Sequence, residues 1–185
     1  MTLSYNANLM IEKLRECVDL YPLLPGLVYR SFFDFVIRHG REYPVVPYTS
    51  KRTGAPKQCF GNAITYAGFF GFAYVEGFAM TDKGGIILHA WNVDADGRLF
   101  DSTWLNRGLA YVGVEFSAER ADDAIWNGDA CVLNDEHRNY PVYQREWKGE
   151  DFTLKWPQSD RLDELRAGLK QMPRSMVEYT KIKGL

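Results

Sequence analysis

The stretch IILHAWNVDADGRLFDSTW, residues 86–104, predicts two β-strands joined by a tight turn. The two likely strands are separated by DADG, a glycine-bearing stretch with the composition of a reverse turn. A three-residue hairpin loop at 95–97 needs a left-handed residue at its last position, which Gly97 supplies. The sequence therefore predicts a hairpin with strands at about 86–93 and 98–104.

The type of turn determines which side chains share a face of this hairpin. With a three-residue loop, Trp91 pairs with Asp101 and His89 pairs with Thr103. His89 and Asp101 then lie diagonally on one face, about 7–8 Å apart between α-carbons, which a ring and a carboxylate can span. A two-residue loop would place them on opposite faces, because a shift by one residue inverts the side chains.

Helical apolar spacing comes before the hairpin and strand patterns come around it, which indicates an α+β fold with helices packed on an antiparallel sheet. Asn8 is the expected cap of the first helix and Ser117 that of a helix after the sheet. A loop is expected at 41–58 because prolines and mixed charges gather there. The other expected elements are helices at 8–20, 29–39, from 59 onward and at 159–170, and strands at 72–80, 111–116 and 131–135.

Length and composition indicate a single domain over residues 1–185 with a C-terminal appendage at about 159–185. A hydrophobic content of 46% and 25% charged residues are typical of a globular protein. The net charge of -2, without a basic cluster, argues against nucleic acid as a partner. No apolar run approaches the length of a membrane span, and the N-terminus lacks the pattern of a secretory signal. We therefore expect a cytoplasmic protein without a nucleic acid or membrane partner.

Three cysteines, odd in number and widely spaced, indicate free thiols in a reducing compartment. No CxxC pair supports a structural zinc site. Cys17 lies on an apolar helical stripe, and both Cys17 and Cys131 are expected to be inert core residues. Cys59 differs because it stands at the start of a predicted helix.

The position of Cys59 favours nucleophilic chemistry. The dipole and free N–H groups of a helix N-terminus stabilise a thiolate, and they can stabilise an oxyanion on an attacked carbonyl. An imidazole from His89 would pair with the thiolate, and Asp101 would orient the ring and stabilise its charged form. The sequence thus predicts a catalytic triad of Cys59, His89 and Asp101.

Three neighbours of the triad are candidates for substrate binding. Gln58 precedes Cys59 and can offer a side-chain donor, although it is also explained as a solvated loop residue. Trp91 and Trp104 can wall a cleft, although both are also explained by packing. Four further polar residues have structural interpretations: His39 at a helix end, Asn62 orienting a loop, Glu76 on a solvent face, and His137 in a loop.

The order of these residues resembles that of transglutaminase-like proteins. Cys59 begins C-F-G-N-A, the strand Y-V-E-G-F-A follows, and H-A-W-N-V-D-A-D-G-R-L-F-D-S-T-W contains His89 and Asp101. The resemblance covers residues 57–104, and Ser102 stands where family members often have proline. It implies a papain-like core in which the nucleophile-bearing helix packs on the sheet.

The resemblance also implies a class of reaction. Proteins with this core include peptidases, amidases, deamidases and acyltransferases. We therefore expect a cysteine-dependent hydrolase or acyl-transfer enzyme that acts on an amide, isopeptide or thioester bond of a protein, peptide or other amide-containing substrate, without a cofactor or metal. Papain-type peptidases fit less well, because Thr53 stands where their oxyanion glutamine would be. Arylamine acetyltransferases fit less well too, because R-G-G-x-C is absent.

Two other functions remain open from the sequence. The fold can serve as a non-catalytic domain that binds a peptide or partner protein in an aromatic cleft. Alternatively, Cys59, His89 and Asp101 can hold a metal ion. The acceptor of the acyl group, water or an amine, and the oligomeric state are also open.

Overall fold

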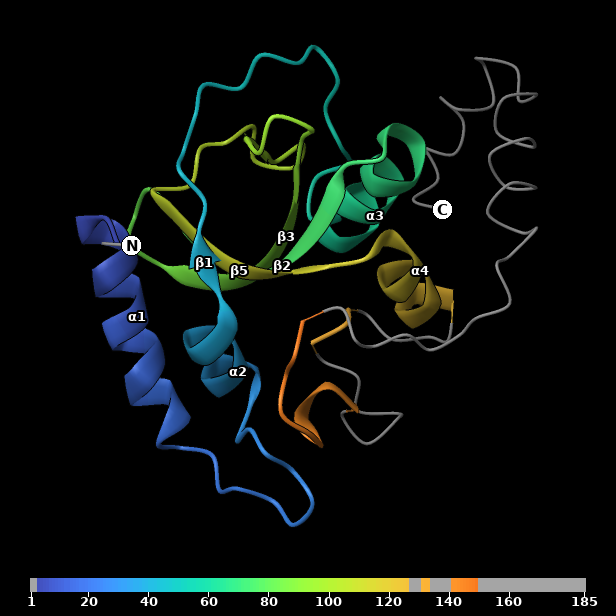
Figure 1. The fold of residues 1–185 in the computed structure, drawn as a ribbon. Coiled ribbons are helices and arrows are strands. Elements are labelled where there is room, and N and C mark those ends of the chain that lie inside the picture. Colours follow the sequence, from blue (N-terminus) through green and yellow to red (C-terminus); the bar gives the residue numbers. More distant parts are fainter. Residues whose placement is uncertain (1–2, 127–130, 134–140, 150–185) are drawn as a thin grey trace.

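The computed structural model describes residues 3–126, 131–133 and 141–149, which form a five-stranded antiparallel sheet and four α-helices (Figure 1). The predicted helix at 159–170, the C-terminal appendage and His137 lie outside the described residues. Within the described ranges, no helix is long and apolar enough to cross a membrane. The elements are α1 (Tyr5–Val18), α2 (Phe32–His39), β1 (Arg41–Glu42), α3 (Cys59–Phe70), β2 (Ala73–Met80), β3 (Ile86–Val93), β4 (Leu99–Phe100), β5 (Ala110–Phe116), α4 (Ala118–Trp126) and a short 3-10 helix, η2 (Pro141–Tyr143).

The sheet has the strand order β1-β5-β2-β3-β4, and all its pairings are antiparallel. The predicted α+β class is therefore confirmed. The central strand β2 is buried on both faces, because the four helices pack on one face of the sheet and the other face supports a second, smaller core. Residues 41–58, predicted as a loop, contribute the short edge strand β1, which pairs Arg41 with Gly113.

Serine caps set the starts of the first two helices. The Ser4 hydroxyl accepts a hydrogen bond from the Ala7 N–H, so α1 begins earlier than predicted and Asn8 is not its cap. Ser31 likewise caps α2, which shortens the helix predicted at 29–39. His39 lies at the end of α2 as predicted, whereas Cys17 is half-buried rather than part of the core.

The predicted three-residue turn of the hairpin is confirmed. The Asp94 N–H donates to the Arg98 carbonyl over 3.0 Å, and the Gly97 N–H donates to the Asp94 carbonyl over 2.9 Å. Gly97 has a φ of 77°, the left-handed conformation that this turn requires. The register pairs Val93 with Leu99, so Trp91 stands opposite Asp101.

The second strand of the hairpin is shorter than predicted, because the chain leaves the sheet at Asp101. One carboxylate oxygen of Asp101 accepts the N–H groups of Thr103 and Trp104, and its carbonyl accepts the N–H of Leu105. These bonds fold residues 102–106 into turns. The predicted pairing of His89 with Thr103 is therefore wrong.

Two further expectations, the strand at residues 131–135 and the exposure of Glu76, are also wrong. Residues 131–133 form no strand, because the consecutive N–H groups of Val132 and Leu133 both donate to the carboxylate of Glu76, at 2.6 and 2.8 Å. Successive N–H groups of a strand point in opposite directions. Glu76, predicted to be exposed, is fully buried because both faces of β2 are covered. Cys131 is buried as predicted.

Candidate active site

Cys59 is the first residue of α3, as predicted. Gln58 occupies the cap position and its side chain makes no capping hydrogen bond. Lys57, just before it, has a φ of 61°, which turns the chain sharply into the helix. The residue at the cap position therefore leaves the first N–H groups of α3 without a side-chain cap beside the half-buried thiol. Gln58 is exposed, and its predicted role in substrate binding stays a prediction.

Asn62, one turn into α3, fixes the approach to Cys59. Its side chain accepts the Ala55 N–H over 3.0 Å and donates to the Ala55 carbonyl over 2.8 Å. It also donates to the Thr103 hydroxyl over 2.8 Å. A side chain at Gly54 would lie 2.4 Å from the Asn62 amide, so this contact requires glycine. Asn62 thus joins the loop before the nucleophile to the turn after Asp101, and the predicted orienting role is confirmed.

His89 and Asp101 meet in the core, as the hairpin register predicted. His89 Nε2 lies 2.8 Å from Asp101 Oδ2. The two residues are 1% and 0% exposed, respectively, so water does not screen the pair. Because Nε2 is committed to Asp101, Nδ1 is the nitrogen available to a nucleophile. Nδ1 is buried and has no well-formed hydrogen bond to any described residue.

The Cys59 thiol is close enough to affect the imidazole. Burial lowers the pKa of His89, but the hydrogen bond to Asp101 and the charges of Asp101 and the nearby Cys59 sulfur outweigh it and raise the pKa to about 9. The thiol is not aligned as a hydrogen-bond partner of Nδ1, and such loose contacts are common in catalytic pairs before substrate binds. The arrangement therefore favours an imidazolium beside the sulfur at neutral pH.

Asp101 is held by two side chains that sequence reasoning missed, one a donor and the other an acceptor. The Tyr111 hydroxyl donates to Oδ2 over 2.9 Å, and the Asn106 side chain accepts the Asp101 N–H over 2.7 Å. Burial and the charge of Asp101 raise the pKa of Tyr111 well above its ordinary value, so the hydroxyl stays a donor. No local motif indicated these contacts, because the strand pattern of β5 explains Tyr111 as a core residue.

Aromatic rings cover the pair. Trp104 is half-buried and stacks on His89 with ring centroids 4.3 Å apart. Trp91 is buried, packs edge-on against Tyr111, and occupies space that only a glycine at 113 leaves open. Of the two tryptophans predicted to touch substrate, Trp104 thus lies at the site, whereas Trp91 is enclosed in the second core.

Cys59, His89 and Asp101 are not arranged as a metal site. Among the described residues, no group of three or more His, Cys, Asp and Glu side chains could hold a metal ion. The metal interpretation of Cys59, His89 and Asp101 therefore has no structural support.

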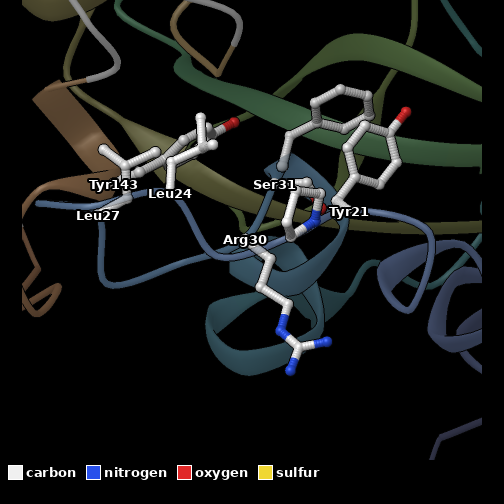
Figure 2. A pocket seen from close by; sticks show the side chains of 8 residues that line it. Tyr21, Leu24, Leu27, Arg30, Ser31 and Tyr143 are labelled. Carbon is white, nitrogen blue, oxygen red and sulfur yellow. The ribbon is translucent and has the colours of Figure 1, made fainter.

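A small cavity lies elsewhere on the molecule. It encloses about 150 Å³ between the segment after α1, the start of α2 and Tyr143. Figure 2 shows Tyr21, Leu24 and Leu27 around it, with the Arg30 side chain extending away from them. Its lining is mainly apolar and shares no residue with the Cys59 site.

The raised pKa of His89 predicts how stability changes with pH. The folded state binds this proton more tightly than the unfolded state, whose histidine has a pKa of 6.5. The stabilisation is therefore fully present below pH 6.5 and is lost as the pH rises through about 9. At about 1.4 kcal/mol per pKa unit, we expect the free energy of unfolding to fall by about 2–3 kcal/mol over this range. Urea unfolding at several pH values measures this fall in the free energy of unfolding. The His89→Asn variant should not show it. If the free energy of unfolding of both proteins changed equally with pH, the prediction would be wrong.

Comparisons of the chain with models of known protein families, with curated proteins and with solved structures found no match. The functional assignment therefore depends on the chemistry of the residues.

Proposed function

We propose that the protein is a cysteine-dependent hydrolase or acyl-transfer enzyme that acts on an amide, isopeptide or thioester bond. The observation that carries this proposal is the buried His89–Asp101 pair beside the thiol at the start of α3. The resemblance to transglutaminase-like proteins supports it, since the same three residues occur in the same order. A papain-like arrangement of α3 on the sheet is part of the proposal.

The first half of the reaction forms an acyl-enzyme. The Cys59 sulfur attacks the carbonyl carbon, and the electron pair of the C=O bond moves to oxygen. The uncapped N–H groups at the start of α3 stabilise this oxyanion. As the oxyanion collapses, the bond to the leaving nitrogen or sulfur breaks, and the His89 imidazolium donates a proton to that atom.

The second half releases the acyl group. Water or an amine attacks the thioester while His89 accepts a proton from the nucleophile, and the Cys59 thiolate leaves. The Asp101 carboxylate accepts the hydrogen bond from Nε2 of His89 and keeps the proton on that nitrogen, so that Nδ1 exchanges the proton with the reacting groups. Trp104 covers one face of the ring and limits the access of water to the ion pair.

Burial supports an enzyme over a domain that only binds a partner. An ion pair without solvent is expensive to maintain unless each charge is well satisfied. Here Asp101 accepts four hydrogen bonds, from His89, Tyr111 and two main-chain N–H groups. A binding domain would have no use for such an arrangement beside a thiol.

The reactivity of Cys59 tests the proposal. We expect iodoacetamide at pH 7 to alkylate Cys59 at least about tenfold faster than a model thiol, because the sulfur lies at a helix N-terminus beside the His89 ring. Mass spectrometry of the labelled peptide measures the rate, and half-buried Cys17 is the internal control. The His89→Ala substitution should lower the alkylation rate of Cys59 and leave that of Cys17 unchanged. If Cys59 reacts no faster than the model thiol, or if its rate is unchanged in His89→Ala, the proposed mechanism is wrong.

A further inference from the structure

Two donors share one oxygen of the Asp101 carboxylate. Oδ1 accepts the main-chain N–H groups of Thr103 and Trp104. Oδ2 accepts from His89 Nε2 over 2.8 Å and from the Tyr111 hydroxyl over 2.9 Å. Tyr111 therefore binds the same atom that orients the imidazole, although the reaction proposed above gives it no part.

A second contact of the Tyr111 hydroxyl determines the direction of its bond to Asp101. The Gly108 N–H donates to the hydroxyl oxygen over 3.0 Å. Because an N–H can only donate, the hydroxyl proton is left for the carboxylate. Burial and the charge of Asp101 raise the pKa of Tyr111, so the phenol keeps that proton. Tyr111 is thus a donor to Oδ2 throughout the neutral pH range.

Close packing fixes the position of the Tyr111 ring. Tyr111 lies in β5 and is fully buried. A Cβ atom at residue 108 would lie 2.6–2.9 Å from three atoms of its side chain, including the hydroxyl oxygen, so this approach requires glycine. Trp91 packs edge-on against the ring, with centroids 5.3 Å apart. The hydroxyl is therefore held in place against Asp101.

A second donor on Oδ2 weakens the hold of Asp101 on the protonated ring. A hydrogen bond to a carboxylate stabilises its negative charge and lowers its affinity for a further proton or donor. The positive end of the Tyr111 O–H dipole also points toward the oxygen that the imidazolium binds. Because His89 and Asp101 are buried, water does not screen this opposing effect.

The proposed reaction limits how tightly the imidazolium can be held. His89 must donate a proton to the leaving group and later accept one from the nucleophile. Proton transfer in both directions is most effective when the pKa of the group lies near the working pH. Despite burial, Asp101 and Cys59 raise the pKa of His89 to about 9, so a stronger hold would favour retention of the proton.

We propose that Tyr111 is a positioning residue that limits how firmly Asp101 retains the protonated form of His89, so that the ring can release its proton to the leaving group. Tyr111 acts through Asp101, from the second core. Its role in a reaction depends on the proposed function, whereas its effect on His89 can be measured independently of that function.

NMR titration of the imidazole nitrogens in a Cys59→Ala background tests the inference. The titratable groups around the ring are Cys59 from α3, Asp101 after β4 and Tyr111 from β5. Tyr48, in the loop before α3, also senses the charge of Asp101. Removing the thiol leaves the Asp101 pair as the measured interaction. In Tyr111→Phe we expect the proton affinity of His89 to rise about three- to tenfold, because Oδ2 loses a donor.

A fluorinated side chain at position 111 gives a change of the opposite sign. 3-Fluorotyrosine fills nearly the same space as Tyr111, but its hydroxyl is more acidic and a stronger donor. The proton affinity of His89 should therefore fall, by about twofold. Tyr43→Phe is the matched control, because Tyr43 is buried in the same second core and its hydroxyl donates to Glu115. This control should leave the titration of His89 unchanged.

The outcomes separate this inference from the enzyme proposal. If the proton affinity of His89 is unchanged or lower in Tyr111→Phe, or if phenylalanine and 3-fluorotyrosine shift it in the same direction, Tyr111 is only a packing residue and the inference is overturned. Fast alkylation of Cys59 by iodoacetamide would still support the enzyme in that case. Slow alkylation contradicts the enzyme proposal and with it any role of Tyr111 in a reaction, whatever the titration shows.

Discussion

Replacing Asp101 by asparagine is expected to reduce kcat/KM by about 10³–10⁴-fold while the fold is retained. Oδ1 of Asp101 accepts two main-chain N–H groups, so the amide oxygen of an asparagine must take that place. Its NH2 group then faces His89, and Nε2 becomes the acceptor. The ring would carry its proton on Nδ1, on the side of Cys59, where it cannot accept one.

Alkylation kinetics and NMR of the imidazole nitrogens test this expectation even without a known substrate. Cys59 should lose its fast reaction with iodoacetamide, and the nitrogen spectra should show the proton on Nδ1. Asp96→Asn is the matched control, because Asp96 lies at the exposed tip of the same hairpin. An Asp101→Asn protein that retains both the wild-type tautomer and the wild-type alkylation rate would rule out an orienting role for this carboxylate.

Replacing Glu76 by alanine is expected to lower the free energy of unfolding by about 3–5 kcal/mol. The change leaves three buried donors unpaired: the Tyr74 hydroxyl, which donates over 2.6 Å, and the N–H groups of Val132 and Leu133. It also opens a cavity in the main core. A loss of this size is a large fraction of the 5–15 kcal/mol that typically stabilises a domain.

Urea unfolding measures the loss of stability, and two further variants serve as comparisons. Glu76→Gln keeps the shape but turns an NH2 group toward a donor, so it should cost about 1–3 kcal/mol. Glu12→Ala, on the exposed side of α1, should change stability by less than about 0.5 kcal/mol. If Glu76→Ala were as stable as Glu12→Ala, the hydrogen bonds to residues 132 and 133 would not anchor that segment.

Local signals in the sequence were sufficient for the hairpin and for the start of α3. The DADG turn fixed the register, and with it the shared position of His89 and Asp101. The predicted starts of helices were less accurate, because several polar residues near each start can act as the cap. Which of them does so depends on the packing of the whole chain. Ser4 was selected over Asn8 in this way.

Contacts between distant segments were beyond the reach of sequence patterns. Tyr111 reaches Asp101 only because the turns at residues 102–106 return the chain to β5, and nothing near either residue indicates this. Glu76 was misjudged because a carboxylate in a strand normally faces water. Its burial depends on donors from a segment more than fifty residues away.

The side chain of Asn62 links the two halves of the site mechanically. One amide holds the main chain at Ala55, just before the sulfur, and the hydroxyl of Thr103, just after the carboxylate. A displacement of the loop before Cys59 is therefore passed through Asn62 to the turn after Asp101. Cys59 and Asp101 would then move together. A ligand bound to this loop would then change the geometry of Cys59, His89 and Asp101 without contacting any of the three.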